Sequence, residues 1–265
     1  MIFARLRKAF GRDSTPDTPS LPAKPAIPPG QLVYAIGDIH GEVDLLRRLL
    51  ERVRQDMAQR SDLAATVVFL GDYIDRGPDS RGVLELLLSD PLPGARLRFL
   101  RGNHEQTMLE FLVDPLAAAD WLRFGGVETL SSYGVRAPPG PLEPDRLRQL
   151  AASLAERLPP AHLSFLQNTT FMAAVGDYAF VHAGIRPGIA LNRQKQDDLL
   201  WIREEFLDKP FQSSHVIVHG HTITDEPELL PHRIGLDTGA YASGILTALI
   251  LQGQEREVMQ VQRGG

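Results

Sequence analysis

The sequence predicts an α/β protein in which two β-sheets form a sandwich flanked by helices, with a helical segment inserted in the chain. Apolar runs of strand length alternate with helical patterns over residues 31–100, helical patterns dominate residues 105–165, and short strand-like runs return over residues 171–261. Alternating strands and helices are typical of a parallel sheet with right-handed crossovers. The later density of short strands indicates a second sheet that is mixed or antiparallel.

The composition is that of a globular chain. Of the 265 residues, 43% are hydrophobic and 23% are charged, which is enough for one large domain or two small ones. The absence of cysteine excludes disulfide bonds, thiolate metal sites and cysteine nucleophiles. A net charge of -5 argues against a nucleic-acid partner held by a broad basic surface. No apolar run is long enough for a membrane span, and we expect a cytoplasmic location.

Residues 1–30 are predicted to be a basic, proline-rich tail. They carry five Lys or Arg residues and two Asp residues, so the tail has a charge of +3 and the rest of the chain a charge of -8. Residues 1–12 could form amphipathic turns that touch a membrane surface or a partner weakly, but we favour a frayed terminus. Residues 13–30 contain six prolines, which predicts an extended linker. We therefore expect a single folded domain over residues 31–265.

The domain begins with a β-α-β-α-β unit. The strands are short, apolar and rich in β-branched residues, and the helices show apolar residues at helical spacing. For the second helix, Asp79 or Ser80 is the expected N-cap, and Pro91 lies beyond its end. In order, the expected elements are a strand over 32–36, a helix over 42–59, a strand over 66–70, a helix over 79–89 and a strand over 96–100.

The inserted segment, residues 105–165, is expected to be a helical lobe within the same domain. Its helices are predicted over 105–113, 115–122 and 144–158, with interruptions at Gly125-Gly126 and at the proline-rich stretch 138–144. The chain then returns to strands, and Gly176-Asp177 predicts a hairpin turn between the first two. The expected later strands cover residues 171–175, 178–182, 216–218, 233–236, 244–251 and 257–261.

Polar side chains follow each strand of the first unit directly. Asp38 and His40 follow the first strand, Asp72 follows the second and Asn103 follows the third. The separations of 34 and 31 residues each correspond to about one β-α-β unit. Parallel strands one unit apart end at the same sheet edge, where α/β proteins bind their ligands. We therefore expect these four side chains to converge.

Later strands add histidines to this set. His182 follows one apolar strand, and His219 and His221 follow another, where residues two apart share a face. Carboxylate, amide and imidazole groups without a soft ligand suit Mn, Fe, Zn or Mg. Six or more such groups exceed the needs of one tetrahedral ion, so two ions sharing a bridging carboxylate are the economical arrangement. Any one of these motifs alone could be a cap or a turn, but burying all of them together without metal would be costly.

Five short motifs, taken in their order along the chain, resemble those of a known family. They are GDIHG, GDYIDRG, GNHE, HAG and GHT, within roughly residues 32–251. Together they resemble the signature of the metallophosphoesterase superfamily, and more closely that of the phosphoprotein phosphatase family of serine/threonine phosphatases in its compact bacterial and phage-type form. The resemblance implies the calcineurin-like metallophosphoesterase fold and two divalent metal ions, with manganese ahead of iron, zinc or magnesium.

The resemblance also implies the metal ligands. The Gly-His-Thr motif assigns the last ligand to His221, and His219 is expected behind the ligands, with a place lining the site as the other possibility. Carried over position by position, the first ion would be bound by Asp38 and His40, both ions by Asp72, and the second ion by Asn103, His182 and His221.

Further roles follow from the same resemblance. His104 would be the general acid that protonates the leaving alkoxide, and Asp75 would orient it. Arg76 and Arg203 would bind the phosphate oxygens, and Tyr241 would line the site. A serine or threonine alkoxide is a poor leaving group, so a proton donor is chemically required. Two cations would offset the charge of a phosphate dianion and make a bridging hydroxide available near neutral pH.

We therefore expect a metal-dependent serine/threonine protein phosphatase that hydrolyses phosphomonoesters by direct attack of a metal-bridging hydroxide, with phosphorylated proteins as its partners. The alternative in the same superfamily is a symmetrical bis(5'-nucleosyl)-tetraphosphatase. Enzymes of that type tend to carry motifs similar to Gly-Asp-Leu-Val-x-Arg-Gly and Gly-Asn-His-Asp. The corresponding motifs here are GDYIDRG and GNHE, in which Asp75 and Glu105 favour the protein phosphatases. A non-catalytic metal-bound scaffold is a third alternative. The sequence leaves the oligomeric state open.

Overall fold

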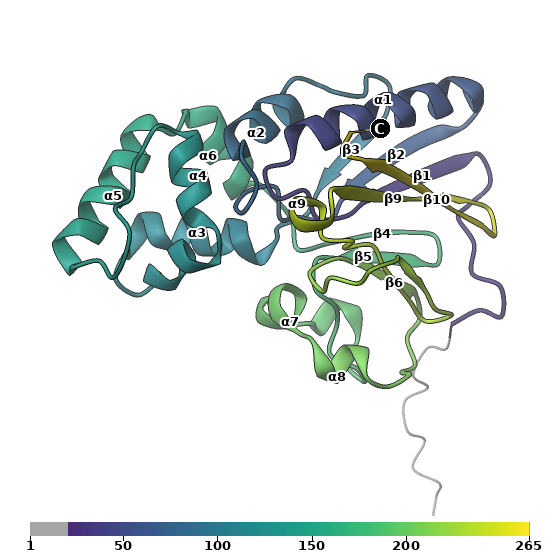
Figure 1. Cartoon of the computed structure of the whole chain (residues 1–265). Coiled ribbons are helices and arrows are strands. Elements are labelled where there is room, and N and C mark those ends of the chain that lie inside the picture. The colour runs from purple at the N-terminus through teal and green to yellow at the C-terminus, as the bar shows by residue number, and fades with distance from the viewer. Residues whose placement is uncertain (1–20, 265) are drawn as a thin grey trace, which may run out of the picture.

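The computed structural model describes residues 21–264, and within that part of the chain two five-stranded sheets pack face to face (Figure 1). The first sheet contains the parallel pairs β1–β2 and β2–β3, with the antiparallel hairpin β9–β10 added beside β1. In order across this sheet, the strands are β10 (Glu255–Gln262), β9 (Ile245–Gln252), β1 (Gln31–Ile36), β2 (Ala64–Phe69) and β3 (Arg96–Phe99).

The second sheet is mixed, because β5, β6 and β8 are parallel while β4 and β7 run antiparallel at its two edges. In order across it, the strands are β4 (Met172–Val175), β5 (Tyr178–Val181), β6 (Val216–His219), β8 (Arg233–Gly235) and β7 (Glu228–Leu229). This architecture confirms the predicted two-sheet α/β fold, including the hairpin turn at Gly176-Asp177.

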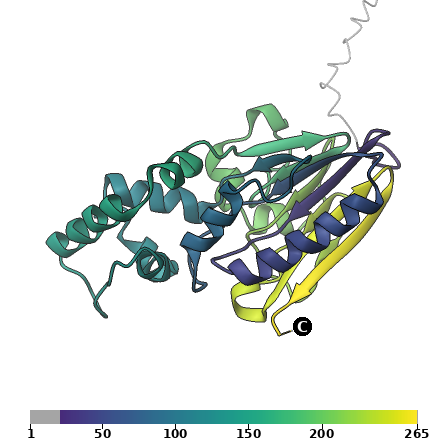
Figure 2. The same ribbon diagram turned by 90° about the horizontal axis from the view of Figure 1, so that it is seen from above.

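Helices cover the outer face of each sheet. Figures 1 and 2 show α1 (Val43–Gln59) lying along the first sheet with α2 (Ser80–Leu88) beside it, while α7 (Gln196–Trp201) and α8 (Glu204–Leu207) lie beyond the second sheet. The carboxylate of Asp79 accepts a hydrogen bond of 2.7 Å from the backbone N–H of Gly82, so Asp79, rather than Ser80, is the N-cap of α2. Two short elements complete this part, η2 (Leu191–Arg193) and α9 (Ala240–Ser243).

The residues of β1 show how the layers are held together. Leu32, Tyr34 and Ile36 belong to the apolar cluster under α1 and α2, whereas Val33 and Ala35 belong to the cluster between the two sheets. All five are fully buried. Because successive side chains of a strand point to opposite faces, one uninterrupted apolar strand supplies two cores.

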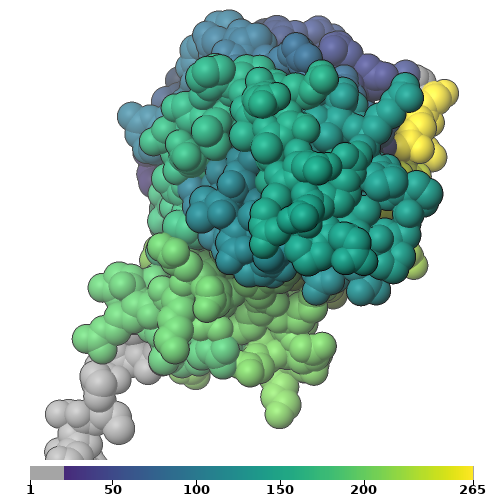
Figure 3. All heavy atoms as spheres, turned by 90° about the vertical axis from the view of Figure 1, so that its left-hand side faces the viewer, coloured from purple at the N-terminus to yellow at the C-terminus, as the bar shows by residue number. Residues whose placement is uncertain are grey.

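The inserted helical lobe projects from one end of the sandwich, and it fills the upper part of the view in Figure 3. Its amphipathic helices bury leucines against one another; Leu147, Leu150 and Leu154 of one helix are examples. The elements of the lobe are α3 (Asn103–Val113), η1 (Ala119–Phe124), α4 (Gly126–Ser132), α5 (Pro144–Arg157) and α6 (Pro160–Gln167).

Two expectations need correction, and a third is confirmed. The strands predicted over 244–251 and 257–261 belong to the first sheet and not the second, because β9 pairs with the free edge of β1. The helix predicted over 115–122 is instead a 3-10 helix over Ala119–Phe124. The interruption predicted at Gly125-Gly126 is confirmed: Gly125, with φ of 111°, ends η1, and α4 begins at Gly126.

The packed body begins within the predicted linker. Ile27 is 1% exposed in the core between the sheets, and its backbone N–H donates to the carbonyl of Gly253 at 2.7 Å. The possible amphipathic turns of residues 1–12 lie outside the described residues. Over residues 21–264, no helix is both long enough and apolar enough to cross a membrane.

Candidate active site

The chain turns sharply at the ends of the strands that carry the candidate ligands. Residues 21–264 contain six non-glycine residues in the left-handed region, and five of them belong to the predicted site. Such a conformation costs about 1–2 kcal/mol for an ordinary L-residue, so it persists where surrounding contacts enforce it. The five are His40, Asp72, Asp75, Arg76 and His221, with φ values of 45°, 50°, 73°, 66° and 64°.

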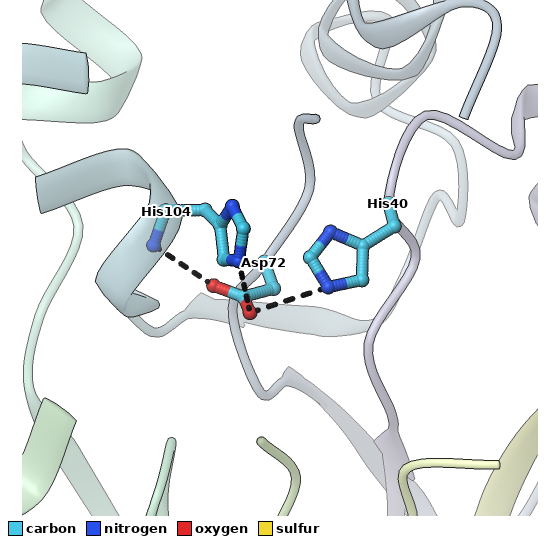
Figure 4. Close-up of side chains that lie close together, drawn as sticks. All are labelled: His40, Asp72 and His104. Atoms are coloured by element: carbon cyan, nitrogen blue, oxygen red, sulfur yellow. Dashed lines mark hydrogen bonds and ion pairs between the residues drawn. The ribbon is translucent and has the colours of Figure 1, made fainter. Parts of the chain in front are cut away.

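Asp72 lies at the centre of the site. Its Oδ2 atom is 3.4 Å from Nε2 of His40, 3.5 Å from Nε2 of His182 and 3.9 Å from Nε2 of His104. Figure 4 shows His40 and His104 on either side of this carboxylate. Loops from both sheets therefore bring imidazoles to one acidic group.

The imidazole rings are oriented from behind by backbone carbonyls. Nδ1 of His40 lies 2.8 Å from the carbonyl of Ile74, and Nδ1 of His182 lies 2.9 Å from the carbonyl of Leu70. A carbonyl only accepts, so Nδ1 carries the proton in both rings. The lone pair on each Nε2 is then directed at the centre of the site, which is the arrangement of a metal-ligating histidine.

Asn103, at the start of α3, brings the second group of acceptors together. Its Oδ1 atom is 2.8 Å from Nε2 of His182 and 2.9 Å from Nδ1 of His221. With its proton on Nδ1, His182 presents a lone pair to the amide oxygen of Asn103. Two facing acceptors repel each other unless a cation lies between them.

The donor set fits two divalent cations. Residues 21–264 contain two groups of potential ligand atoms, and within each group the atoms lie within 4.8 Å of one another. Asp72 belongs to both groups. Nε2 of His221 and Oδ1 of Asp38 are buried and have no hydrogen-bond partner within the described part of the chain, although buried polar atoms are normally paired. One group comprises His40, Asp72 and His104, and the other comprises Asp72, His182 and His221.

Asp38 belongs to neither group of potential ligand atoms found among residues 21–264. It is 3% exposed, and its Oδ2 atom accepts the backbone N–H of His221 at 2.9 Å. Its role as a ligand of the first ion therefore stays a prediction, supported by the unpaired Oδ1 atom. The geometry places His104 in that group instead.

The electrostatics of the cluster favour cations. Burial lowers the pKa of His40 to about 3, so its ring is neutral and able to ligate. Burial opposes ionisation of Asp72, but the surrounding imidazoles of His182, His104 and His40 lower its pKa below the ordinary value. Burial and the carboxylates of Asp237 and Asp72 raise the pKa of Asp38 well above its ordinary value. Bound cations would offset this accumulation of buried carboxylates.

His104 and Asp75 form a close pair beside Asp72. Nδ1 of His104 is 2.6 Å from Oδ2 of Asp75, which is fully buried. Burial by itself lowers the pKa of His104, but the carboxylates of Asp72 and Asp75 raise it to about 8. Nε2 points toward the centre of the site, so this ring can hold a proton there near neutral pH.

A cavity of about 340 Å³ opens onto these groups. Arg203 lies at its mouth and donates to Oγ1 of Thr222 at 3.2 Å. Arg76 donates to the hydroxyl of Tyr241 at 3.0 Å and lies over its ring at 4.9 Å. Exposed Phe124 and Trp201 complete the rim. Both arginines and the tyrosine are thus brought to the site.

His219 takes no part in this cavity. Its ring is fully buried behind the site, where Nδ1 lies 3.0 Å from the carbonyl of Gly220 and the ring packs edge-on against Phe206 at 5.0 Å. The structure therefore distinguishes His221, which joins the ligand group, from His219, which lies behind the ligands and does not line the cavity.

Sequence reasoning missed the role of Glu105. Its carboxylate accepts the backbone N–H groups of Gly102, Asp72 and Tyr73, each at 2.8 Å. It therefore ties the loop after β2 to the loop after β3. The available signal was its place as the third residue of α3, where a glutamate can accept backbone N–H groups of the preceding turn.

Glycines permit the close approach of these loops. A Cβ atom on Gly102 would lie 2.0 Å from Oδ1 of Asp72, and one on Gly220 would lie 2.0 Å from Oδ1 of Asp38. Alanine at either position would force a carboxylate of the site to move.

Adding Mn²⁺ is expected to raise the melting temperature of the protein, because the cation would bind the assembled ligands and not the unfolded chain. At a concentration one hundred times the Kd, one site stabilises the folded state by about 2.7 kcal/mol. Differential scanning calorimetry with and without Mn²⁺ measures the shift. His232→Asn, outside both ligand groups, is the control and should show the same shift. A melting temperature unaffected by Mn²⁺ would contradict the site.

Comparison with known proteins agrees with the metal-binding geometry of the site. Residues 32–234 match the sequence profile of the calcineurin-like phosphoesterase family. The chain is 31% identical over 228 residues to serine/threonine-protein phosphatase 1 of Salmonella typhimurium, covering 83% of this chain and 92% of that protein. It is 25% identical over 232 residues to the asymmetrical bis(5'-nucleosyl)-tetraphosphatase PrpE of Bacillus thuringiensis, covering 81% and 88%. A crystal structure provisionally named as a diadenosine tetraphosphatase shares the fold, with a TM-score of 0.62, 22% identity and coverage of 91% and 100%.

Proposed function

Since this chain belongs to the calcineurin-like phosphoesterase family, we propose that it is a metal-dependent phosphatase that acts on phosphoserine and phosphothreonine in proteins. The observation that carries the proposal is the contact of 2.6 Å between His104 and Asp75. An alkoxide leaves phosphorus readily only if it is protonated. A histidine whose pKa is raised to about 8 and whose Nε2 faces the site is suited to that task.

We further propose that manganese occupies both sites. His40, Asp72 and Asp38 would hold one ion, and Asp72, Asn103, His182 and His221 the other. When bound, the two ions supply a hydroxide nucleophile near neutral pH and offset the charge of the phosphate dianion. The hard oxygen and borderline nitrogen donors of this set, without any sulfur, suit manganese.

The two arginines of the cavity would bind the phosphate. Their planar guanidinium groups donate paired hydrogen bonds to phosphate oxygens and distribute charge over them. The hydroxyl and ring of Tyr241 orient Arg76, whereas Arg203 is exposed at the mouth, with Thr222 as a hydrogen-bond partner. Arg76 therefore offers a preorganised contact, and Arg203 offers one that can close over a bound substrate.

A second candidate is hydrolysis of dinucleoside tetraphosphates. The 25% identity to an asymmetrical bis(5'-nucleosyl)-tetraphosphatase supports it, and the aromatic rim of Phe124 and Trp201 offers surfaces on which a base could stack. The leaving group in that reaction is itself a phosphate, which needs less protonation. The buried acid pair would then have little to contribute, which is why we rank the protein phosphatase first.

A direct comparison of substrates tests this ranking. We expect kcat/KM for a phosphoserine peptide to exceed that for diadenosine tetraphosphate by at least about tenfold, since the acid pair favours alkoxide departure. Analysis of the nucleotide products would also distinguish symmetrical from asymmetrical cleavage. A higher kcat/KM for the dinucleotide would reverse the ranking. No turnover of either substrate, or of 4-nitrophenyl phosphate with added Mn²⁺, would instead favour a metal-bound scaffold.

A further inference from the structure

Three side chains hold the carboxylate of Asp75: His104 at the start of α3, and two from later elements of the inserted helical lobe. Oδ2 accepts from Nε1 of Trp121 at 2.8 Å as well as from Nδ1 of His104 at 2.6 Å. Oδ1 accepts from the hydroxyl of Thr129 at 2.6 Å. Trp121 lies in η1 and Thr129 in α4, so both donors come from the lobe rather than from the sandwich.

This set of contacts is closed to solvent. Asp75 and Thr129 are fully buried, and Trp121 is 1% exposed. A buried carboxylate is costly unless donors satisfy its oxygens, and the three donors together occupy both of them. Thr129 also accepts the backbone N–H of Asp75 at 2.9 Å, so it fixes the main chain and the side chain of the same residue.

The backbone of the lobe is also attached to this loop. The N–H of Arg76 donates to the carbonyl of Gly125 at 3.2 Å, and a Cβ atom on Gly125 would lie 2.6 Å from the backbone nitrogen of Arg76. Asp75 and Arg76 both hold the left-handed conformation, which needs such external contacts. The lobe therefore determines where the Asp75 carboxylate points.

We infer that Trp121 and Thr129 are positioning residues for the general acid, so that the helical lobe completes the catalytic acid pair. The inference rests on the proposed function, in which His104 protonates a leaving alkoxide. Nε1 of Trp121 and Nδ1 of His104 share one carboxylate oxygen, so losing the indole donor leaves that oxygen with His104 as its partner and weakens the hold on the carboxylate. His104 then loses its fixed orientation, and proton delivery to the leaving oxygen suffers while metal and phosphate binding do not.

Trp121→Phe tests the inference because it removes the N–H but keeps an aromatic ring packed against Phe111. We expect kcat for a phosphoserine peptide to fall about tenfold, a fraction of the usual contribution of general acid catalysis. For 4-nitrophenyl phosphate, whose leaving group needs little protonation, kcat should fall less than about twofold, and KM should stay unchanged for both. Metal content should equal that of the unaltered enzyme.

Thr129 provides a second variant and a rescue. Thr129→Val removes the hydroxyl at nearly constant volume and should produce the same dependence on the leaving group, whereas Thr129→Ser should restore activity. Tyr133→Phe is the matched control, because it removes a buried hydrogen bond of 2.7 Å to His162 in the same lobe without touching Asp75. It should leave the ratio of the two kcat values unchanged.

If Trp121→Phe and Thr129→Val each lowered kcat equally for the phosphoserine peptide and for 4-nitrophenyl phosphate, the inference would be overturned. The proposed function would remain supported by the activity of the unaltered enzyme on the phosphopeptide. An unaltered enzyme that hydrolyses neither ester would overturn the proposed function, and the inference with it.

Discussion

Replacing Asp72 with asparagine is expected to lower kcat roughly 10³-fold or more and to remove at least one bound cation. Asp72 is the carboxylate common to both ligand groups, and its Oδ2 atom lies within 3.9 Å of three imidazoles. Asparagine keeps the shape of the side chain but offers one neutral oxygen in place of two charged ones. Neither cation would then have its shared negative charge.

The measurement pairs steady-state kinetics with metal content per chain on the same sample. Asp145→Asn is the control, because that residue makes only an exposed ion pair with Arg148 on α5 and should change neither quantity. An Asp72→Asn enzyme that retains both ions and most of its turnover would refute the shared site.

His104→Asn is expected to lower kcat for a phosphoserine peptide by about 10²–10⁴-fold, the range that general acid catalysis contributes. The loss for 4-nitrophenyl phosphate should be much smaller. Because the protonated ring is the active form and the carboxylate of Asp75 favours it, turnover of the peptide by the unaltered enzyme should fall as the pH rises through the pKa of His104. The variant should lack this decline.

Metal analysis decides between the two roles that the geometry allows for His104. As a general acid, its loss leaves two ions bound; as a ligand in the group with His40 and Asp72, its loss removes one. His162→Asn, a buried histidine of the lobe that contacts Tyr133, controls for general destabilisation. Full turnover of the phosphopeptide by His104→Asn would overturn the acid assignment.

The sequence predicted the site best where residues with metal-binding side chains directly follow parallel strands. Asp38, His40, Asp72 and Asn103 could be placed together because each follows an apolar strand, and consecutive parallel strands end at one edge. The same periodicity could not assign a sheet to β9, because an apolar strand carries no mark of its pairing partner.

Local sequence patterns could not predict contacts between segments that are far apart in the chain. Trp121 has the sequence environment of an ordinary core residue, and its Nε1 donor meets Asp75 only because the lobe folds back over the loop after β2. Nothing in the sequence around Thr129 predicts that its hydroxyl binds Asp75. Short helices such as α7 and α9 were missed because four to six residues show too little periodicity to detect.

The division of the ligands between the sheets has a consequence for how the protein forms. His40, Asp72 and His104 are all encoded before residue 105, whereas the second group needs His182 and His221 from the other sheet. During synthesis the second cation site cannot exist until residue 221 has left the ribosome. A cation held there would be bound by residues of both layers, so separating the layers during unfolding would release it.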